Sequence, residues 1–396
     1  MARTGELAPF PGTDLLDDRM RALYRYCGEL ASEFREPGLA IDADPDRIDD
    51  YLHLPGVRLN QFVHLPPRYR PQLDFPPAIL DAGATSLGWV VLWEQLAYGD
   101  PGVTLAGPRP SLFGAMVTAM ADESQSERYF SRLAATPANT FFGLTEPARG
   151  SAAIELETAI TPVPGDGGWL LNGEKCYIGN GARSVLGVVF CRRAPGPFGI
   201  EAVVLDTSSP GFSAELLPTI GLRGARISRM RFENVPVPPE NLLGAHLPPG
   251  RRGLNGALPA LYRARPSVAA MAIGCARAVC DYVGQQRSSL AKADQWRMDE
   301  LLDRMAAIRR LIYRTAADID LGIVNVHRIG AVKVQAAHLA EEATLLAADL
   351  LGAASLIEHT WLEKIYRDVR AFEFAEGTTN VHWLSIFAGL RKRSFL

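Results

Sequence analysis

A short stretch near the C-terminus places a carboxylate in an apolar setting. Residues 367–380 read Arg-Asp-Val-Arg-Ala-Phe-Glu-Phe-Ala-Glu-Gly-Thr-Thr-Asn, with Glu376 directly before Gly377. Burial beside Phe374 and Ala375 would raise the pKa of a carboxyl group, which makes its ionised form a stronger base. Glycine at 377 ends a helix and lets another molecule approach the backbone. The stretch predicts that Glu376 is a general base beside a ligand-binding turn.

A structural interpretation of Glu376 is equally open at this point. Arg367 and Arg370 belong to the same stretch, and either could form a buried ion pair with the glutamate. The hydroxyl of Thr378 and the amide of Asn380 follow at once and suit a polar ligand. These residues alone do not separate a base from an ion pair.

A second polar stretch, residues 142–151, reads Phe-Gly-Leu-Thr-Glu-Pro-Ala-Arg-Gly-Ser. Its hydroxyls and exposed backbone N–H groups suit a cofactor ring or a phosphate, although a polar turn between two domains has the same composition. Residues 168–175 superficially resemble a P-loop, but Glu174 stands where lysine is required. Because the expected setting is a hairpin and not a strand-to-helix turn, a P-loop is excluded. No GxGxxG motif follows a strand either, so a Rossmann dinucleotide site is not indicated.

Length and composition set the class of protein. The 396 residues exceed one ordinary core, so two or three domains are expected, and 47% hydrophobic with 21% charged residues is typical of soluble globular proteins. A net charge of −3 with scattered arginines gives no indication of nucleic-acid or membrane-surface binding. The first residues show no signal peptide, and no apolar run approaches the ~18 residues of a membrane helix.

Cysteine and histidine usage indicates a reducing compartment without a metal site. The five cysteines are odd in number and form no CxxC pair, which favours free thiols. The seven histidines show no HExxH or comparable ligand spacing. We therefore expect a cytoplasmic protein that binds no metal.

Hydrophobic periodicity predicts an α–β–α order. A helix is expected over 16–34, followed by helices at 86–98, 111–120 and 124–133. Short β-rich runs then occupy 152–160, 168–171, 185–191, 201–205 and 227–232, with a hairpin turn at 165–168. They predict an antiparallel barrel or sandwich.

The C-terminal part returns to helical periodicity. Apolar stripes over 298–312 and 329–350, with helices at 269–283 and 361–374, predict a four-helix bundle. The expected domains are an N-terminal α-helical domain (1–138), a middle β domain (139–250) and the bundle (251–396).

Taken in order, six motifs resemble the acyl-CoA dehydrogenase family of flavoproteins. They are Leu-Thr-Glu-Pro to Gly-Ser at 144–151, Leu-Asn-Gly-Glu-Lys at 171–175, Gly-Leu-Arg-Gly at 221–224, the stretch 237–244 ending in Asn-Leu-Leu-Gly, Arg-Pro at 265–266, and Arg-Asp leading to Glu-Gly-Thr at 367–378. The resemblance covers nearly the whole chain and implies the same helix–sheet–helix fold.

The resemblance also implies roles for individual residues. Glu376 matches the catalytic base; some members carry that base one residue before the Arg-Pro motif, where this chain has Ala264. Arg265, Gly377 and Ser151 match substrate contacts. The residues that match FAD contacts, some of them across subunits, are Phe142, Leu144, Thr145, Ser151, Tyr177, Ile178, Gly179, Arg287, Gly352, Thr378 and Asn380.

Several positions depart from the family pattern. Tyr177-Ile178-Gly179 replaces Trp-Ile-Thr and loses a hydroxyl that would bond the flavin N5. Residues 352–355 replace a Gly-Gly-x-Gly loop, the segment after Arg287 is degenerate and shortened, and Tyr262 stands in place of an aspartate. These departures favour a divergent member of the family that serves secondary metabolism.

The reaction implied is FAD-dependent α,β-dehydrogenation of an acyl thioester carried by CoA or by a carrier protein. Glu376 would remove the α-proton while the β-hydride moves to FAD N5, and an electron-transfer flavoprotein or oxygen would take the electrons. The resemblance further implies a homo-oligomer, either a tetramer or a dimer.

Two other functions remain open from the sequence. A flavin-dependent monooxygenase or N-hydroxylase would have the same fold but needs no carboxylate at position 376. A flavin-free binding protein would account for the altered segments near Arg287 and Gly352. Flavin absorbance of the purified protein separates the last from the other two.

Overall fold

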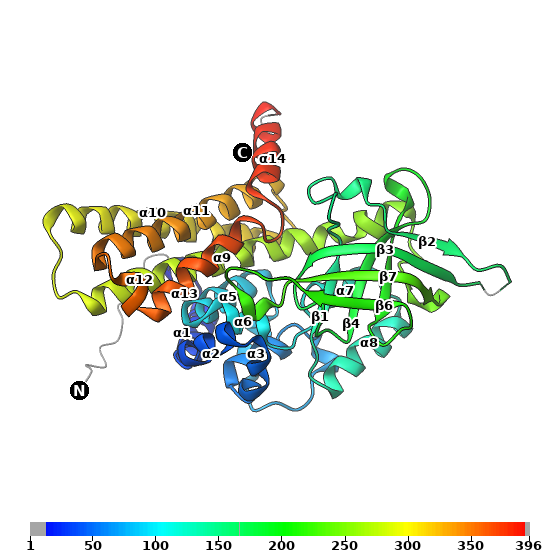
Figure 1. The fold of residues 1–396 in the computed structure, drawn as a ribbon, viewed down its shortest axis with the longest axis horizontal. Coiled ribbons are helices and arrows are strands. Elements are labelled where there is room, and N and C mark those ends of the chain that lie inside the picture. Colours follow the sequence, from blue (N-terminus) through cyan, green and yellow to red (C-terminus); the bar gives the residue numbers. More distant parts are fainter. Residues whose placement is uncertain (1–12, 166, 393–396) are drawn as a thin grey trace.

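Among the described residues, the N-terminal part up to Ala135 is built of helices joined by loops (Figure 1). The computed structural model describes residues 13–165 and 167–392. The helices are α1 (Asp18–Ala31), α2 (Arg35–Ala43), α3 (Pro55–Phe62), α4 (Pro77–Gly83), α5 (Ser86–Gly99), α6 (Pro101–Ala106), α7 (Ser111–Met120) and α8 (Glu123–Ala135). Local signals set their starts: Asp17 accepts a hydrogen bond from the Met20 N–H, and Asp122 forms a capping box with Gln125.

The middle of the chain forms one open, mixed sheet. Its strands are β1 (Thr140–Gly143), β2 (Ala159–Pro162), β3 (Trp169–Ile178), β4 (Leu186–Arg192), β5 (Ile200–Asp206), β6 (Phe212–Leu216), β7 (Ser228–Val237) and β8 (Leu242–Leu243). They are ordered β6-β7-β3-β2-β4-β5-β8, and β1 pairs with β4. Of the predicted barrel or sandwich, the barrel alternative is wrong, because β6 and β8 end the sheet without pairing to each other.

Strand pairing also departs from a purely antiparallel pattern. The hairpin predicted before β3 is present, with β2 and β3 antiparallel. However, β1 and β2 both pair parallel to β4, because long connections separate them from it. The strand predicted over 152–160 is instead a 3-10 turn (Ala153–Glu155) followed by β2.

The C-terminal part contains long helices packed along one another (Figure 1). They are α9 (Gly253–Gln286), α10 (Lys292–Asp320), α11 (Val326–Leu351), α12 (Ser355–Glu358), α13 (Thr360–Asp368) and α14 (Thr379–Arg391). The helix predicted over 361–374 is shorter than expected: α13 ends at Asp368 and a 3-10 segment, η9 (Val369–Glu373), follows it. The helix–sheet–helix order is confirmed.

Helix α9 is the central core helix. It passes through Pro259 and Pro266 and is much longer than the predicted 269–283. Among the described residues, the segment Pro249–Gln286 is long and apolar enough to cross a membrane, which corrects the expectation from sequence. Because 83% of its most apolar 18 residues are buried between other elements, it has the character of a core helix.

A buried charge cluster joins the three parts of the chain. Lys364 on α13 lies 2.6 Å from Asp100 at the start of α6 and 2.5 Å from Asp368. Asp368 also accepts a hydrogen bond from the Leu222 N–H, in the loop before β7. Gly221 lies so close to the Arg367 backbone that a Cβ would overlap it. These contacts position the segment that leads to Glu376.

Candidate active site

Glu376 lies in a tight loop between η9 and α14. Its φ of +56° is in the left-handed region, and Gly377 follows with a φ of +102°. A side chain in this conformation costs roughly 1–2 kcal/mol, so surrounding contacts must hold it there. Helix α14 begins immediately afterwards, where the Thr378 hydroxyl accepts a hydrogen bond from the Val381 N–H.

Two cationic side chains bind the backbone of this loop. Arg265 of α9 donates from Nε to the Glu376 main-chain oxygen, at 3.1 Å. Lys333 of α11 donates from Nζ to the main-chain oxygens of Glu373 and Gly377, both at 2.7 Å. The loop is therefore held from α9 and α11 at once.

Glu373 serves the neighbouring helix. Its carboxylate accepts hydrogen bonds from the N–H and the hydroxyl of Thr379, in the first turn of α14. A carboxylate at a helix N-terminus is favourable because it meets unpaired N–H groups and the positive end of the helix dipole. Glu373 thus fixes the direction in which α14 leaves the loop.

The Glu376 carboxylate has no such partner. Among the described residues it forms no ion pair and no hydrogen bond. Arg367 instead pairs with Asp42 and Glu363, and Arg370 pairs with Glu341, so neither forms the ion pair that the sequence left open. Burial raises the pKa of the Glu376 carboxyl group, opposed by the charges of Arg265 and Lys333.

A buried ion pair positions the predicted cofactor-binding loop at Thr145. Lys175 on β3 lies 2.9 Å from Glu146 and also donates to the Leu144 main-chain oxygen at 3.0 Å. The Cys176 N–H donates to the Thr145 oxygen, at 2.9 Å. The motifs at 144–151 and 171–175 therefore meet, and the Thr145 hydroxyl has no partner among the described residues.

The residues expected behind a flavin ring lie at the end of β3. Tyr177 has a φ of +62° and its side chain is 64% exposed, whereas Ile178 is buried. Gly179 is open, since its nearest neighbour to an added Cβ would be the Ala225 oxygen at 4.0 Å. Phe142 on β1 is half-buried and Ser151 is exposed.

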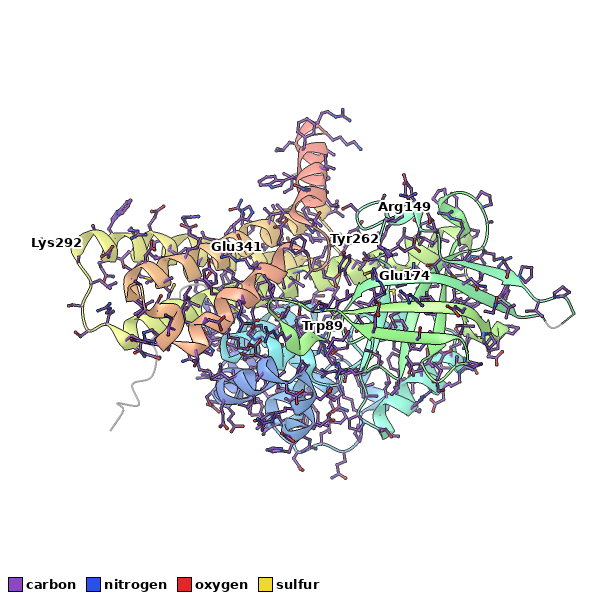
Figure 2. All side chains as sticks on the ribbon, in the orientation of Figure 1. Trp89, Arg149, Glu174, Tyr262, Lys292 and Glu341 are labelled. Atoms are coloured by element: carbon purple, nitrogen blue, oxygen red, sulfur yellow. The ribbon has the colours of Figure 1, made fainter. Side chains whose placement is uncertain are left out.

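The remaining predicted residues lie elsewhere in the chain. Arg287 donates to the Leu351 oxygen at 3.0 Å, so it is a neighbour of Gly352. Arg287 directly follows α9 and Gly352 directly follows α11, and Figure 2 labels Lys292, at the start of α10, at the opposite side of the molecule from Glu174. The hydroxyl of Thr378 is occupied in capping α14, while Asn380 is exposed.

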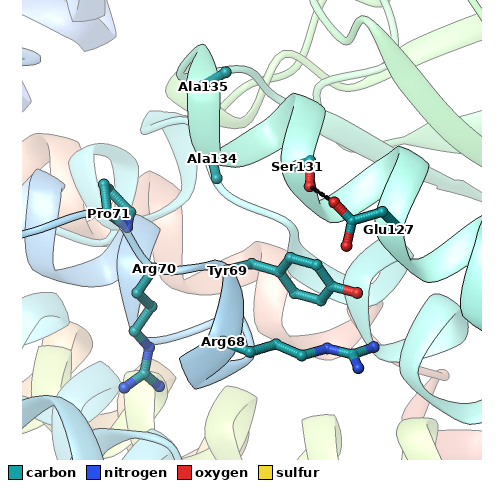
Figure 3. A pocket seen from close by; sticks show the side chains of 8 residues that line it. All are labelled: Arg68, Tyr69, Arg70, Pro71, Glu127, Ser131, Ala134 and Ala135. Carbon is teal, nitrogen blue, oxygen red and sulfur yellow. Dashed lines mark hydrogen bonds between the residues drawn. The ribbon is translucent and has the colours of Figure 1, made fainter.

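Two surface grooves lie away from Glu376. One of about 450 Å³ is lined by the 3-10 turn Pro67–Tyr69 and by α8, with Arg68, Tyr69 and Glu127 around it (Figure 3). The other, of about 410 Å³, lies beside Glu146 and Glu174. Neither is lined by a residue of the predicted FAD or substrate set, although the second groove borders the 142–151 stretch through Glu146, Pro147 and Ala148.

Sequence reasoning missed three residues of the loop's support: Lys333, Glu373 and His382. The sequence carried one signal for Lys333: it is a lysine within an apolar stripe of α11, where a charged residue is rarely buried. His382 is buried on α14, and its Nε2 would lie 3.2 Å from a Cβ on Gly377. Their contacts join α11, η9 and α14, which no local pattern reveals.

Two family models match the middle and the C-terminal parts of the chain. Residues 251–390 match the acyl-CoA dehydrogenase C-terminal domain, and residues 141–235 match the acyl-CoA dehydrogenase middle domain. The chain is 31% identical over 284 residues to the acryloyl-CoA reductase (NADH) of Anaerotignum propionicum, covering 68% of this chain and 71% of that protein.

Solved structures share the whole fold. A glutaryl-CoA dehydrogenase from Mycobacterium smegmatis, in complex with FADH2, has a TM-score of 0.81 at 22% identity and covers 96% of each chain. The prolyl acyl carrier protein oxidase AnaB has a TM-score of 0.82 at 20% identity, covering 94% of this chain and 99% of that one. The chain therefore belongs to the acyl-CoA dehydrogenase family, whose members are FAD-dependent oxidoreductases that act on CH–CH donors.

Proposed function

We propose that this protein catalyses α,β-dehydrogenation of an acyl thioester, with Glu376 as the base that removes the α-proton. The observation that carries the proposal is the state of the Glu376 carboxylate. Its side chain is partly buried, which raises its pKa, and it has no ion-pair or hydrogen-bond partner among the described residues, while its backbone is held by Arg265. A carboxylate of raised pKa at a fixed position is suited to abstracting a weakly acidic proton.

The residues around Thr145 fit a flavin ring. The Thr145 hydroxyl is free of partners in the described part of the chain, Phe142 offers a half-buried apolar face, and Gly179 has open space where a side chain would stand. FAD, when bound, supplies the acceptor for the hydride that leaves the β-carbon. Ser151, Thr378 and Asn380 are the proposed contacts to the rest of the cofactor, with Arg287 and Gly352 from a second subunit.

The chain's own residues perform the other half of the reaction. Arg265 and Lys333 fix the main chain on both sides of Glu376, so the carboxylate is positioned before substrate arrives. Burial raises the pKa of the Glu376 carboxyl group, and this makes its ionised form a stronger base. The substrate is proposed to be a CoA- or carrier-bound thioester, and an electron-transfer flavoprotein or oxygen the final acceptor.

A homo-oligomer is part of the proposal. On α14, four large apolar side chains are exposed: Trp383, Leu384, Phe387 and Leu390. The helix projects away from the rest of the molecule (Figure 1). An apolar surface of this kind favours a protein partner, and a second copy would also bring an Arg287–Gly352 pair to a neighbouring cofactor. Light scattering of the flavin-loaded protein tests this, and a monomer that retains FAD contradicts it.

The proposed reaction is tested by anaerobic titration of the purified protein with saturated acyl thioesters. The panel contains short acyl groups on CoA and the same groups, including prolyl, on a carrier protein. Loss of the visible flavin bands together with formation of the α,β-unsaturated thioester supports the proposal. A flavin-loaded protein that no thioester reduces contradicts it.

A further inference from the structure

Lys333 is a buried cation whose hydrogen bonds, within the described part of the chain, go only to backbone oxygens. Its side chain is 1% exposed, between Val332 and Val334 on α11, and within the described residues it forms no ion pair. Its two acceptors are the main-chain oxygens of Glu373 and Gly377, which lie on either side of Glu376. The ammonium therefore spans the loop that carries the carboxylate.

A lysine at such a core position is energetically unfavourable. Burying an ammonium without a carboxylate partner costs several kcal/mol, and an apolar side chain would pack at this position of α11 without that cost. Burial lowers the pKa of Lys333 to about 8, opposed by Glu373 and Glu376. The hydrogen bonds of Lys333 stabilise the loop in which Glu376, a non-glycine residue, is held at a φ of +56°.

The charged groups that face Glu376 come from several elements. Arg265 on α9 and Lys333 on α11 both lower the pKa of its carboxyl group. Glu373 on η9 directs its own carboxylate to Thr379. His382 on α14 is neutral at physiological pH, because burial and the two nearby cations lower its pKa to about 4. Lys333 is thus one of two positive charges that counteract the rise in the Glu376 pKa caused by burial.

We propose that Lys333 is a positioning residue for Glu376: it fixes the loop in its left-handed turn and places a positive charge beside the carboxylate. Removing the side chain then has two separable effects. The backbone of residues 373–379 loses two charge-assisted hydrogen bonds, and the carboxyl group of Glu376 loses a neighbour that favours its ionised form. The role of Lys333 in catalysis rests on the proposed dehydrogenation, but both effects can be measured without a substrate.

The test compares wild type, Lys333→Met and Lys333→Gln, all with cofactor bound. Methionine removes charge and donor, whereas glutamine removes only the charge and still donates. Infrared titration of the carboxyl group, with Glu376→Gln as the spectral blank, reports the ionisation of Glu376. Hydrogen exchange of peptides covering 373–379 reports the loop. The expected result is a titration midpoint moved to higher pH in both variants, and amide exchange about tenfold faster in Lys333→Met.

The control is His382→Gln, which alters packing under Gly377 without changing charge and should leave the midpoint at its wild-type pH. The inference is overturned if Lys333→Met folds and titrates like wild type, or if only its melting temperature falls. Should Lys333→Met not fold, the midpoint in Lys333→Gln decides. A wild type that no thioester reduces, yet whose Glu376 midpoint depends on Lys333, would sink the proposed function and leave this inference intact.

Discussion

Arg265 donates its hydrogen bond to the main-chain oxygen of Glu376, at 3.1 Å, and forms no ion pair with the carboxylate of that residue among the described contacts. The distinction matters chemically. An arginine bonded to the carboxylate would hold it ionised and weaken it as a base, whereas one bonded to the backbone fixes its position and leaves its oxygens free.

Glu376→Gln should preserve the fold and the flavin but abolish most of the reaction. The amide is isosteric with the acid, and no ion pair within the described structure is broken by the change. Loss of a positioned general base costs ~10²–10⁴ in rate. The measurement is anaerobic flavin reduction by the best thioester of the panel, with thermal melting in parallel. A variant that melts much earlier but reduces its flavin normally would make Glu376 structural.

Glu376→Gly and Glu376→Ala form a matched pair that isolates the backbone strain. Both remove the carboxylate, but only glycine adopts a φ near +56° without steric cost. We expect the glycine variant to be more stable than the alanine variant by about 1 kcal/mol, measured by denaturant unfolding. Equal stabilities would show that the loop relaxes out of its left-handed turn when the side chain is shortened.

Lys364→Met should destabilise the whole protein rather than the loop alone. Lys364 is 2% exposed and is bonded to both Asp100 and Asp368, so its loss leaves two buried carboxylates facing each other. Breaking a buried pair in this way costs about 3–5 kcal/mol. Thermal melting measures the effect, with Lys292→Met at the start of α10 as an exposed control. A melting temperature equal to that of the control would contradict the prediction.

Acid should destabilise the protein through His64. This imidazole is buried against Trp89 and Trp93 (Figure 2 labels Trp89), and burial lowers its pKa from 6.5 to about 3. The nearby Arg109, Arg263 and Arg70 contribute to this lowering, and a hydrogen bond with the Asn60 oxygen opposes it.

The unfolded chain therefore binds a proton as the pH falls below about 6.5, while the folded protein does not until about 3. His64 favours folding above that window, and its contribution is lost on acidification at about 1.4 kcal/mol per pH unit. His64→Gln should flatten the fall in unfolding free energy between pH 6 and pH 4, whereas the exposed control His53→Gln should not. Parallel pH profiles for His64→Gln and wild type would refute this.

The sequence by itself determined the elements whose signals are local. The helix predicted at 111–120 coincides with α7, and that predicted at 86–98 with α5, because period and end signals lie within each segment. Glycine directly after Glu376 marked a turn, and the structure has one, with both residues left-handed. Motif order indicated the family, which the comparisons confirm.

Tertiary structure alone decided how those elements meet. Glu146 and Lys175 are 29 residues apart and pair because β3 brings the two motifs together. Lys333 and Gly377 are 44 residues apart and meet because α11 packs beneath the loop. The open sheet with its parallel β1–β4 pair was missed for the same reason. Periodicity reports which face of an element is apolar, but the partner of a buried charge depends on contacts distant in sequence, and the support of Glu376 consists of such contacts.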